Sequence, residues 1–75
     1  MQRGELLKVI GFGCRLYPDI EDWKSDDELF AVARKGEAVV FMGRVTTRWF
    51  RVLHPVHGIR RVHWQDVRMV NNAQG

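Results

Sequence analysis

The sequence predicts a mainly β protein in which five short antiparallel strands curl into a small barrel. Residues 36–70 are rich in β-branched and aromatic side chains, which fit the half-buried surface of a pleated sheet. Within them apolar residues partly alternate with arginines, as in residues 49–52, and this is closer to a period of two than to the helical period. Gly43 and residues 54–58 supply the breaks between strands. Short strands at this spacing are typical of a meander that closes into a barrel.

The first expected strand lies near the start of the chain, in ELLKVIGF, with Leu7, Val9 or their neighbours facing inward. Pro55 presets φ to about −65° and Gly58 tolerates positive φ, so a turn is predicted between two of the later strands. The expected strands span residues 5–12, 37–43, 46–54, 58–63 and 67–70. The expected core consists of Val39, Phe41, Val52, Val62 and Val67.

The segment of residues 25–36 leaves two alternatives open. As a helix, it has Ser25 at the N-cap and Glu28 three residues later, which is a capping box, and Gly36 just past its end. As extended chain, it is a long loop that returns to the sheet. The local signals favour one short helix at about residues 26–35, although isolated helices of this length are marginal and packing must decide.

Length and composition favour one small domain covering residues 1–75, with residues 71–75 as a frayed tail. Cys14 is the single cysteine, which excludes an intrachain disulfide and fits a reduced compartment. No apolar run approaches about 18 residues, and the N-terminus lacks the apolar core of a secretory signal. We therefore expect a soluble, cytoplasmic protein that does not enter a membrane.

Charge is distributed unevenly along the chain. Residues 1–37 contain six basic and eight acidic side chains, whereas residues 38–75 contain six arginines and one aspartate. Most of the acids lie between Asp19 and Glu28. We therefore expect one acidic lobe and one arginine-studded wall, each favouring a partner of opposite charge.

The order of several short motifs resembles that of a Src-homology-3 domain, over roughly residues 13–70. Leu16-Tyr17 is similar to the start of the family's A-L-Y-D-Y signature, and the acidic run lies where the family has a long acidic loop. Lys35-Gly36-Glu37 is similar to the K-G-E turn, and Trp49-Phe50 to the tandem aromatics that open the third strand. Residues 62–67 lie where the family has a strand end, a 3₁₀ turn and the last strand. The resemblance implies a small barrel.

The same resemblance implies a ligand surface that departs from the family's usual one. The family holds proline-rich peptides on a ridge of tyrosines, one tryptophan and a proline. Tyr17 and Trp49 match this ridge, whereas His63 stands in place of the proline and Asp66 in place of the last tyrosine. Recognition of a proline-rich peptide is therefore not expected.

The predicted function is a non-enzymatic protein-binding module, an adaptor or accessory protein whose acidic loop and exposed aromatics engage a basic protein or peptide. The expected binding residues are Tyr17, Asp22, Trp23, Asp26, Asp27, Trp49 and Trp64. The alternative is a nucleic-acid-binding barrel, because small barrels also bind nucleic acids with basic strands and stacking rings. Its expected contacts are Arg44, Arg48, Arg51, Arg60 and Arg61.

Catalysis and metal binding are not expected. Ser25 is the only serine and already has a capping role, and the loop carboxylates should stay ionised rather than act as acids near neutral pH. Structural zinc sites usually include pairs of cysteines, and this chain has one. His54 and His57 are instead expected at a solvated hairpin tip. No catalytic residue, metal ligand or cofactor is therefore assigned.

Overall fold

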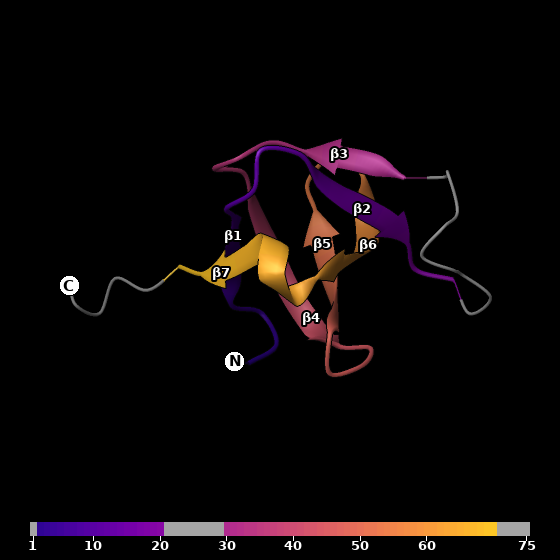
Figure 1. Cartoon of the computed structure of the whole chain (residues 1–75). Helices are drawn as coiled ribbons and strands as arrows, with labels where there is room; N and C mark the ends of the chain where they lie inside the picture. The colour runs from indigo at the N-terminus through magenta and orange to yellow at the C-terminus, as the bar shows by residue number, and fades with distance from the viewer. Residues whose placement is uncertain (1, 21–29, 71–75) are drawn as a thin grey trace.

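The computed structural model describes residues 2–20 and 30–70, which form one antiparallel sheet in the order β3-β2-β6-β5-β4-β1-β7 (Figure 1). The strands are β1 (Leu6–Val9), β2 (Cys14–Pro18), β3 (Ala31–Ala33), β4 (Ala38–Arg44), β5 (Trp49–His54), β6 (Gly58–His63) and β7 (Val67–Met69). A 3₁₀ turn, η1 (Trp64–Asp66), leads into β7. The prediction of a mainly β protein is confirmed.

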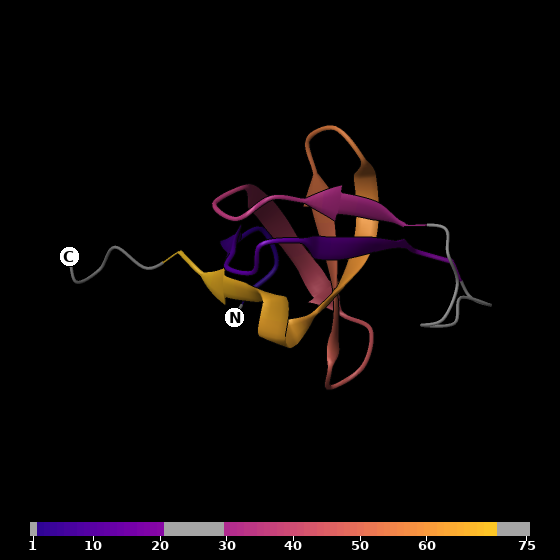
Figure 2. The same cartoon turned by 45° about the horizontal axis from the view of Figure 1, so that its top comes forward.

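The sheet is a curled half-barrel built around the meander β4-β5-β6. β1 pairs with β4 at one side of the meander, and β2, which follows β1 in the chain, pairs with β6 at the other side. Figure 2 shows β2 and β3 crossing in front of the meander, so that the curled sheet covers its own inner face. Burial of that face by the same sheet is what a small chain needs to form a core.

The expected count of five strands is wrong, because seven strands are present. Five of them overlap the predicted ranges, and the two that were missed are β2 and β3. The helix at about residues 26–35 is wrong where the structure describes it, since Ala31–Ala33 pair with Cys14, Arg15 and Leu16. The proposed cap at Ser25 lies outside the described residues. Residues 31–33 form a strand because they pair with β2 and because Ala33 becomes completely buried. The local helix signals contain no information about either contact.

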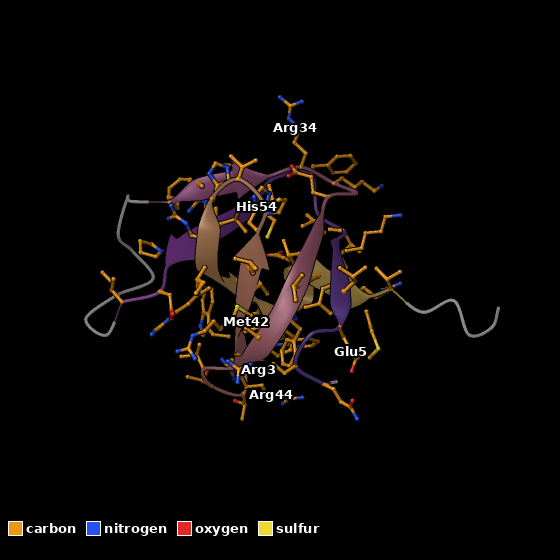
Figure 3. All side chains as sticks on the ribbon, turned by 180° about the vertical axis from the view of Figure 1, so that it is seen from behind. Arg3, Glu5, Arg34, Met42, Arg44 and His54 are labelled. Atoms are coloured by element: carbon orange, nitrogen blue, oxygen red, sulfur yellow. The ribbon has the colours of Figure 1, made fainter. Side chains whose placement is uncertain are left out.

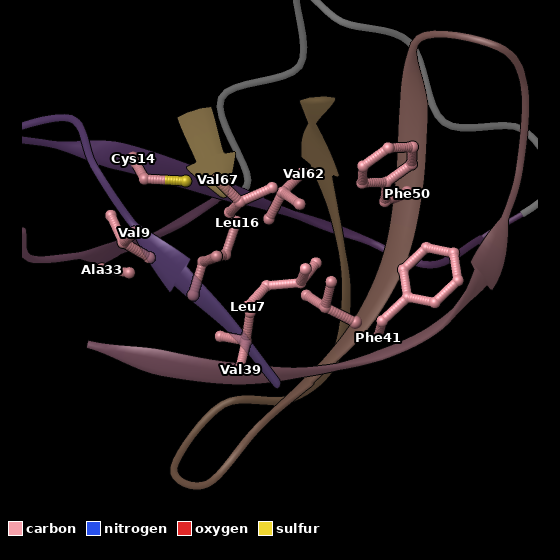
Figure 4. Packing of buried hydrophobic residues seen from close by; sticks show 11 residues of the cluster. Leu7, Val9, Cys14, Leu16, Ala33, Val39, Phe41, Phe50, Val62 and Val67 are labelled. Carbon is pink, nitrogen blue, oxygen red and sulfur yellow. The ribbon is translucent and has the colours of Figure 1, made fainter. Parts of the chain in front are cut away.

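The core lies on the inner face of the curled sheet and contains all five residues predicted for it (Figure 4). It consists of Leu7, Val9, Cys14, Leu16, Ala33, Val39, Phe41, Phe50, Val52, Val62 and Val67. The rings of Phe41 and Phe50 meet edge to face with their centroids 5.3 Å apart. In β5 the inward residues alternate with outward ones, which is the period of two that the sequence showed.

β4 does not end at Gly43, where the sequence suggested a break. The pairing register with β5 shifts between Phe41 and Gly43, and Gly43 has a φ of 138°, which favours glycine. The register shift is a β-bulge, and a bulge bends its strand and increases the twist, which helps the sheet to curl. The turn follows later, where Val45 N and Thr46 N donate hydrogen bonds to Trp49 O.

His54 is buried rather than solvated, because it is the last residue of β5 and points inward. Its Nδ1 accepts hydrogen bonds from Val56 N and His57 N, at 3.1 and 3.2 Å. The proton is therefore on Nε2, which donates to Glu37 Oε1 at 2.7 Å. A hydrogen bond from Arg34 N and this one from His54 lower the pKa of Glu37. The histidine thus joins the β5–β6 turn to Glu37, the residue before β4.

Candidate functional site

Five ring-bearing side chains form a continuous series on the outer face of the sheet, opposite the core. We call this series the aromatic strip, and its members in spatial order are Phe30, Tyr17, Trp49, His63 and Trp64. The centroid distances between successive rings are 5.9, 5.6, 5.1 and 6.2 Å. Three of the contacts are tilted or edge to face, which is the favoured geometry for aromatic pairs.

Strand alternation places the central rings on this face. Leu16 and Phe50 are buried in the core, so their neighbours Tyr17 and Trp49 emerge on the opposite side of β2 and β5. Trp49 lies directly across from His63 in the β5–β6 ladder. η1 then carries Trp64, whose backbone N–H donates to Arg48 O at 2.9 Å and so ties η1 to the β4–β5 turn.

Exposure varies along the strip. Tyr17 in the middle is buried, and Trp49 and His63 beside it are half-buried. Phe30 and Trp64 at the two ends are exposed, at 37% and 45%. The strip therefore has a packed centre and two accessible ends, an arrangement in which a partner can bury ring surface without first ordering the rings.

The structure brings together three of the residues predicted for partner binding, namely Tyr17, Trp49 and Trp64. Phe30 and His63 complete the strip and were not predicted. Their membership depends on which strands are neighbours, and a single sequence carries no direct signal for that. Asp22, Trp23, Asp26 and Asp27 lie outside the described residues.

Asp19 lies beside the strip and holds two arginines. Its carboxylate oxygens accept hydrogen bonds from Arg51 Nε and Arg61 Nε, each at 2.9 Å. Partial burial raises the pKa of Asp19, but the hydrogen bonds and charges of the two guanidinium groups outweigh it and lower that pKa overall. Two arginines predicted to contact nucleic acid are thus already engaged by a carboxylate of the same chain.

The other three arginines of that prediction have different neighbours. Arg44 has its guanidinium 5.5 Å from the centre of the Phe50 ring, and Figure 3 shows it at the end of the sheet opposite His54. Arg60 donates from Nε to His57 O in the turn beside His54. Arg48 lies next to the aromatic strip. Among the described residues the five arginines therefore contact a carboxylate, an aromatic ring, a turn carbonyl or the pocket beside the strip, and they share no single partner.

A surface pocket of about 240 Å³ adjoins the exposed end of the strip and is lined by Arg48, His63, Trp64 and Gln65. His63 Nδ1 accepts a hydrogen bond from Gln65 N at 3.3 Å, which leaves the ring proton on Nε2. Among the residues that the structure describes, no carboxylate lines this pocket. Within residues 2–20 and 30–70, Arg48 forms no ion pair.

Cys14 and the histidines do not form a reactive or metal-binding centre in the part of the chain that the structure describes. Burial, followed by the charges of Asp66 and Glu37, raises the pKa of the Cys14 thiol to about 12, so the nucleophilic thiolate is scarce at neutral pH. No group of three or more potential ligands is close enough to hold a metal ion among these residues. Nor does any described helix have the length and apolarity needed to cross a membrane.

Fold and site together define a small, compact β-barrel-like protein with an aromatic strip on the outer face of its sheet. Comparisons with protein-family models, with curated proteins and with solved structures found no match to this chain.

Proposed function

We propose that this protein is a non-enzymatic protein-binding module that holds a segment of a partner on the aromatic strip. The observation that carries the proposal is the strip itself, in which a buried Tyr17 supports half-buried Trp49 and exposed Trp64. Tryptophan and tyrosine are the residues that most often dominate binding energy at protein interfaces. Rings already packed against one another lose little conformational freedom when a partner covers them.

Charge supports a partner that carries basic side chains. Asp22, Asp26 and Asp27 belong to the acidic stretch that joins Ile20 to Phe30 along the chain, and Phe30 is one end of the strip. Acidic side chains near an apolar anchor increase the association rate of a basic partner and select against acidic ones. Trp23 in the same stretch is a further candidate anchor.

We also infer that the fold is of the Src-homology-3 class. The 3₁₀ turn at residues 64–66 occurs where the resemblance placed it, and Gly36 in the K-G-E motif has a φ of 94°, as a tight turn with glycine allows. The ring of Tyr17 also contacts that of Trp49, the two residues that matched the family's ridge. The presence of seven strands, with β1 and β7 paired beyond β4, distinguishes this chain from the five-stranded arrangement.

A nucleic-acid ligand is the second candidate, because each exposed end of the strip has an arginine beside it. The guanidinium of Arg15 lies 4.7 Å from the centre of the Phe30 ring, and Arg48 shares a pocket with Trp64. Rings flanked by cations suit stacked bases and phosphates. The engagement of Arg51 and Arg61 by Asp19 weighs against this ligand and places it second.

The test is selection of binders from a displayed random-peptide library, with single-stranded DNA and RNA 20-mers titrated in parallel. The Trp64→Ala variant should weaken the selected peptides by about thirtyfold, the usual effect of losing an interface anchor. Phe12→Ala is the matched control, since Phe12 is also an exposed ring, at 87%, and lies outside the strip. Phe12→Ala should leave the affinity unchanged. Failure to select any peptide, or binding of the 20-mers that Trp64→Ala abolishes, would refute the proposal.

A further inference from the structure

The pocket at the end of the strip combines one cation with several hydrogen-bond donors. Arg48 brings a guanidinium with five N–H groups, and Gln65 brings an amide N–H₂. Trp64 adds a large exposed ring with an indole N–H, and His63 keeps its proton on Nε2. With these donors, and with no carboxylate among the described lining residues, the pocket favours an anionic group over a cationic or purely apolar one.

Hydrogen bonds on both sides of Arg48 hold its backbone against η1. Thr46 Oγ1 accepts from Arg48 N and Trp49 N, each at 3.2 Å, and this closes the β4–β5 turn. The carbonyl of Arg48 then accepts from Trp64 N at 2.9 Å. The backbone of Arg48 is therefore held against that of Trp64, which also lines the pocket, and only the side chain of Arg48 has to be ordered on binding.

Among the described residues, Arg48 is the cation that lines this pocket, and it forms no ion pair there. Arg51 and Arg61 are bound by Asp19, whose side chain is only 20% exposed. The pocket therefore offers a single positive charge. One guanidinium matches a carboxylate, with which it can form two parallel hydrogen bonds, whereas phosphate-recognising sites use clusters of arginines.

We propose that this pocket is a carboxylate subsite that receives one acidic group of the peptide bound on the aromatic strip. The inference rests on the proposed function and extends it. A partner segment then has an aspartate, a glutamate or a C-terminal carboxylate at the Trp64 end. Because this pocket lies at one end of the strip, it sets which end of the bound segment lies there.

The test is a double-mutant cycle between protein and peptide. A library-selected peptide that contains a glutamate is compared with its Glu-to-Gln version, both with amidated C-termini, on the wild-type protein and on Arg48→Gln. The glutamate should improve binding to the wild-type protein by about fivefold, the upper range for an exposed ion pair, and should have no effect with Arg48→Gln. A third peptide, with a free C-terminus and no side-chain carboxylate, distinguishes the two sources of the acid.

Arg68→Gln is the matched control, because it removes the same charge from an exposed position on β7. The glutamate should improve binding to Arg68→Gln as much as it improves binding to the wild-type protein. Arg48→Glu should instead bind more tightly to a peptide that has lysine in place of the glutamate. If peptides bind in a Trp64-dependent manner but no carboxylate couples to Arg48, the subsite is wrong and the proposed function stands. If no peptide is selected, both are wrong.

Discussion

Replacement of Asp19 by asparagine should destabilise the protein more than its partial exposure suggests. The change removes the charge that Arg51 and Arg61 share while keeping the size of the side chain and one acceptor oxygen. Surface ion pairs contribute about 0.2–1 kcal/mol each, and Arg61, only 14% exposed, belongs at the upper end of that range. The two pairs together give an expected loss of about 1–2 kcal/mol. In a domain of this size such a loss lowers the Tm by roughly 5–15 °C.

The assay is urea unfolding followed by tryptophan fluorescence, repeated from pH 7 to pH 2. Because the folded-state pKa of Asp19 lies below its ordinary value of 3.8, the stabilisation by its charge is fully present above pH 3.8. It is lost as the pH falls through the folded-state pKa. The difference between wild type and Asp19→Asn should therefore be constant from pH 7 to about pH 5 and shrink toward zero in strong acid.

Asp66→Asn is the matched control, since it makes the same charge change at a carboxylate that forms no ion pair among the described residues. Its cost should stay below about 0.5 kcal/mol. Equal losses in the two variants, or a loss with Asp19→Asn that persists unchanged at pH 2, would refute the role given to this carboxylate. Asp19→Asn also removes the negative charge that Arg51 and Arg61 share, so a gain in oligonucleotide affinity with this variant would show that Asp19 restrains a basic surface.

Three further predictions concern the core, a turn and the thiol. Leu7→Ala should cost about 2–5 kcal/mol in urea unfolding because Leu7 is fully buried, whereas Leu6→Ala, at a position 49% exposed, should cost far less. Gly36→Ala should lower the free energy of unfolding by about 1–2 kcal/mol in thermal unfolding, because Gly36 has a φ of 94°. Gly13→Ala should be nearly neutral, because Gly13 does not have a positive φ, and equal effects of the two changes would contradict the argument from backbone strain. Cys14 should resist iodoacetamide at pH 8 in the folded protein and react after denaturation, as followed by mass spectrometry; rapid labelling of the folded protein would contradict its burial.

The sequence by itself determined the class of the fold and part of the core. Partial alternation with a period of two in residues 49–52 and 61–64 pointed to the inward Val52 and Val62, because each strand of a half-buried sheet puts its apolar side chains on one face. The positive φ of Gly58 was likewise predictable from turn chemistry. Such features depend on neighbours along the chain, so a single sequence contains them.

The tertiary structure alone decided the remaining strands and the site. Residues 31–33 have local helix signals, yet they form β3 because β2 offers a ladder and the core offers burial to Ala33. Asp19 reaches Arg51 and Arg61 across 32 and 42 positions of sequence, and His54 reaches Glu37 across 17. These contacts, like the order of rings in the aromatic strip, follow from which strands are neighbours. Strand order is settled by the summed burial and pairing of the whole sheet, which no local pattern of residues records.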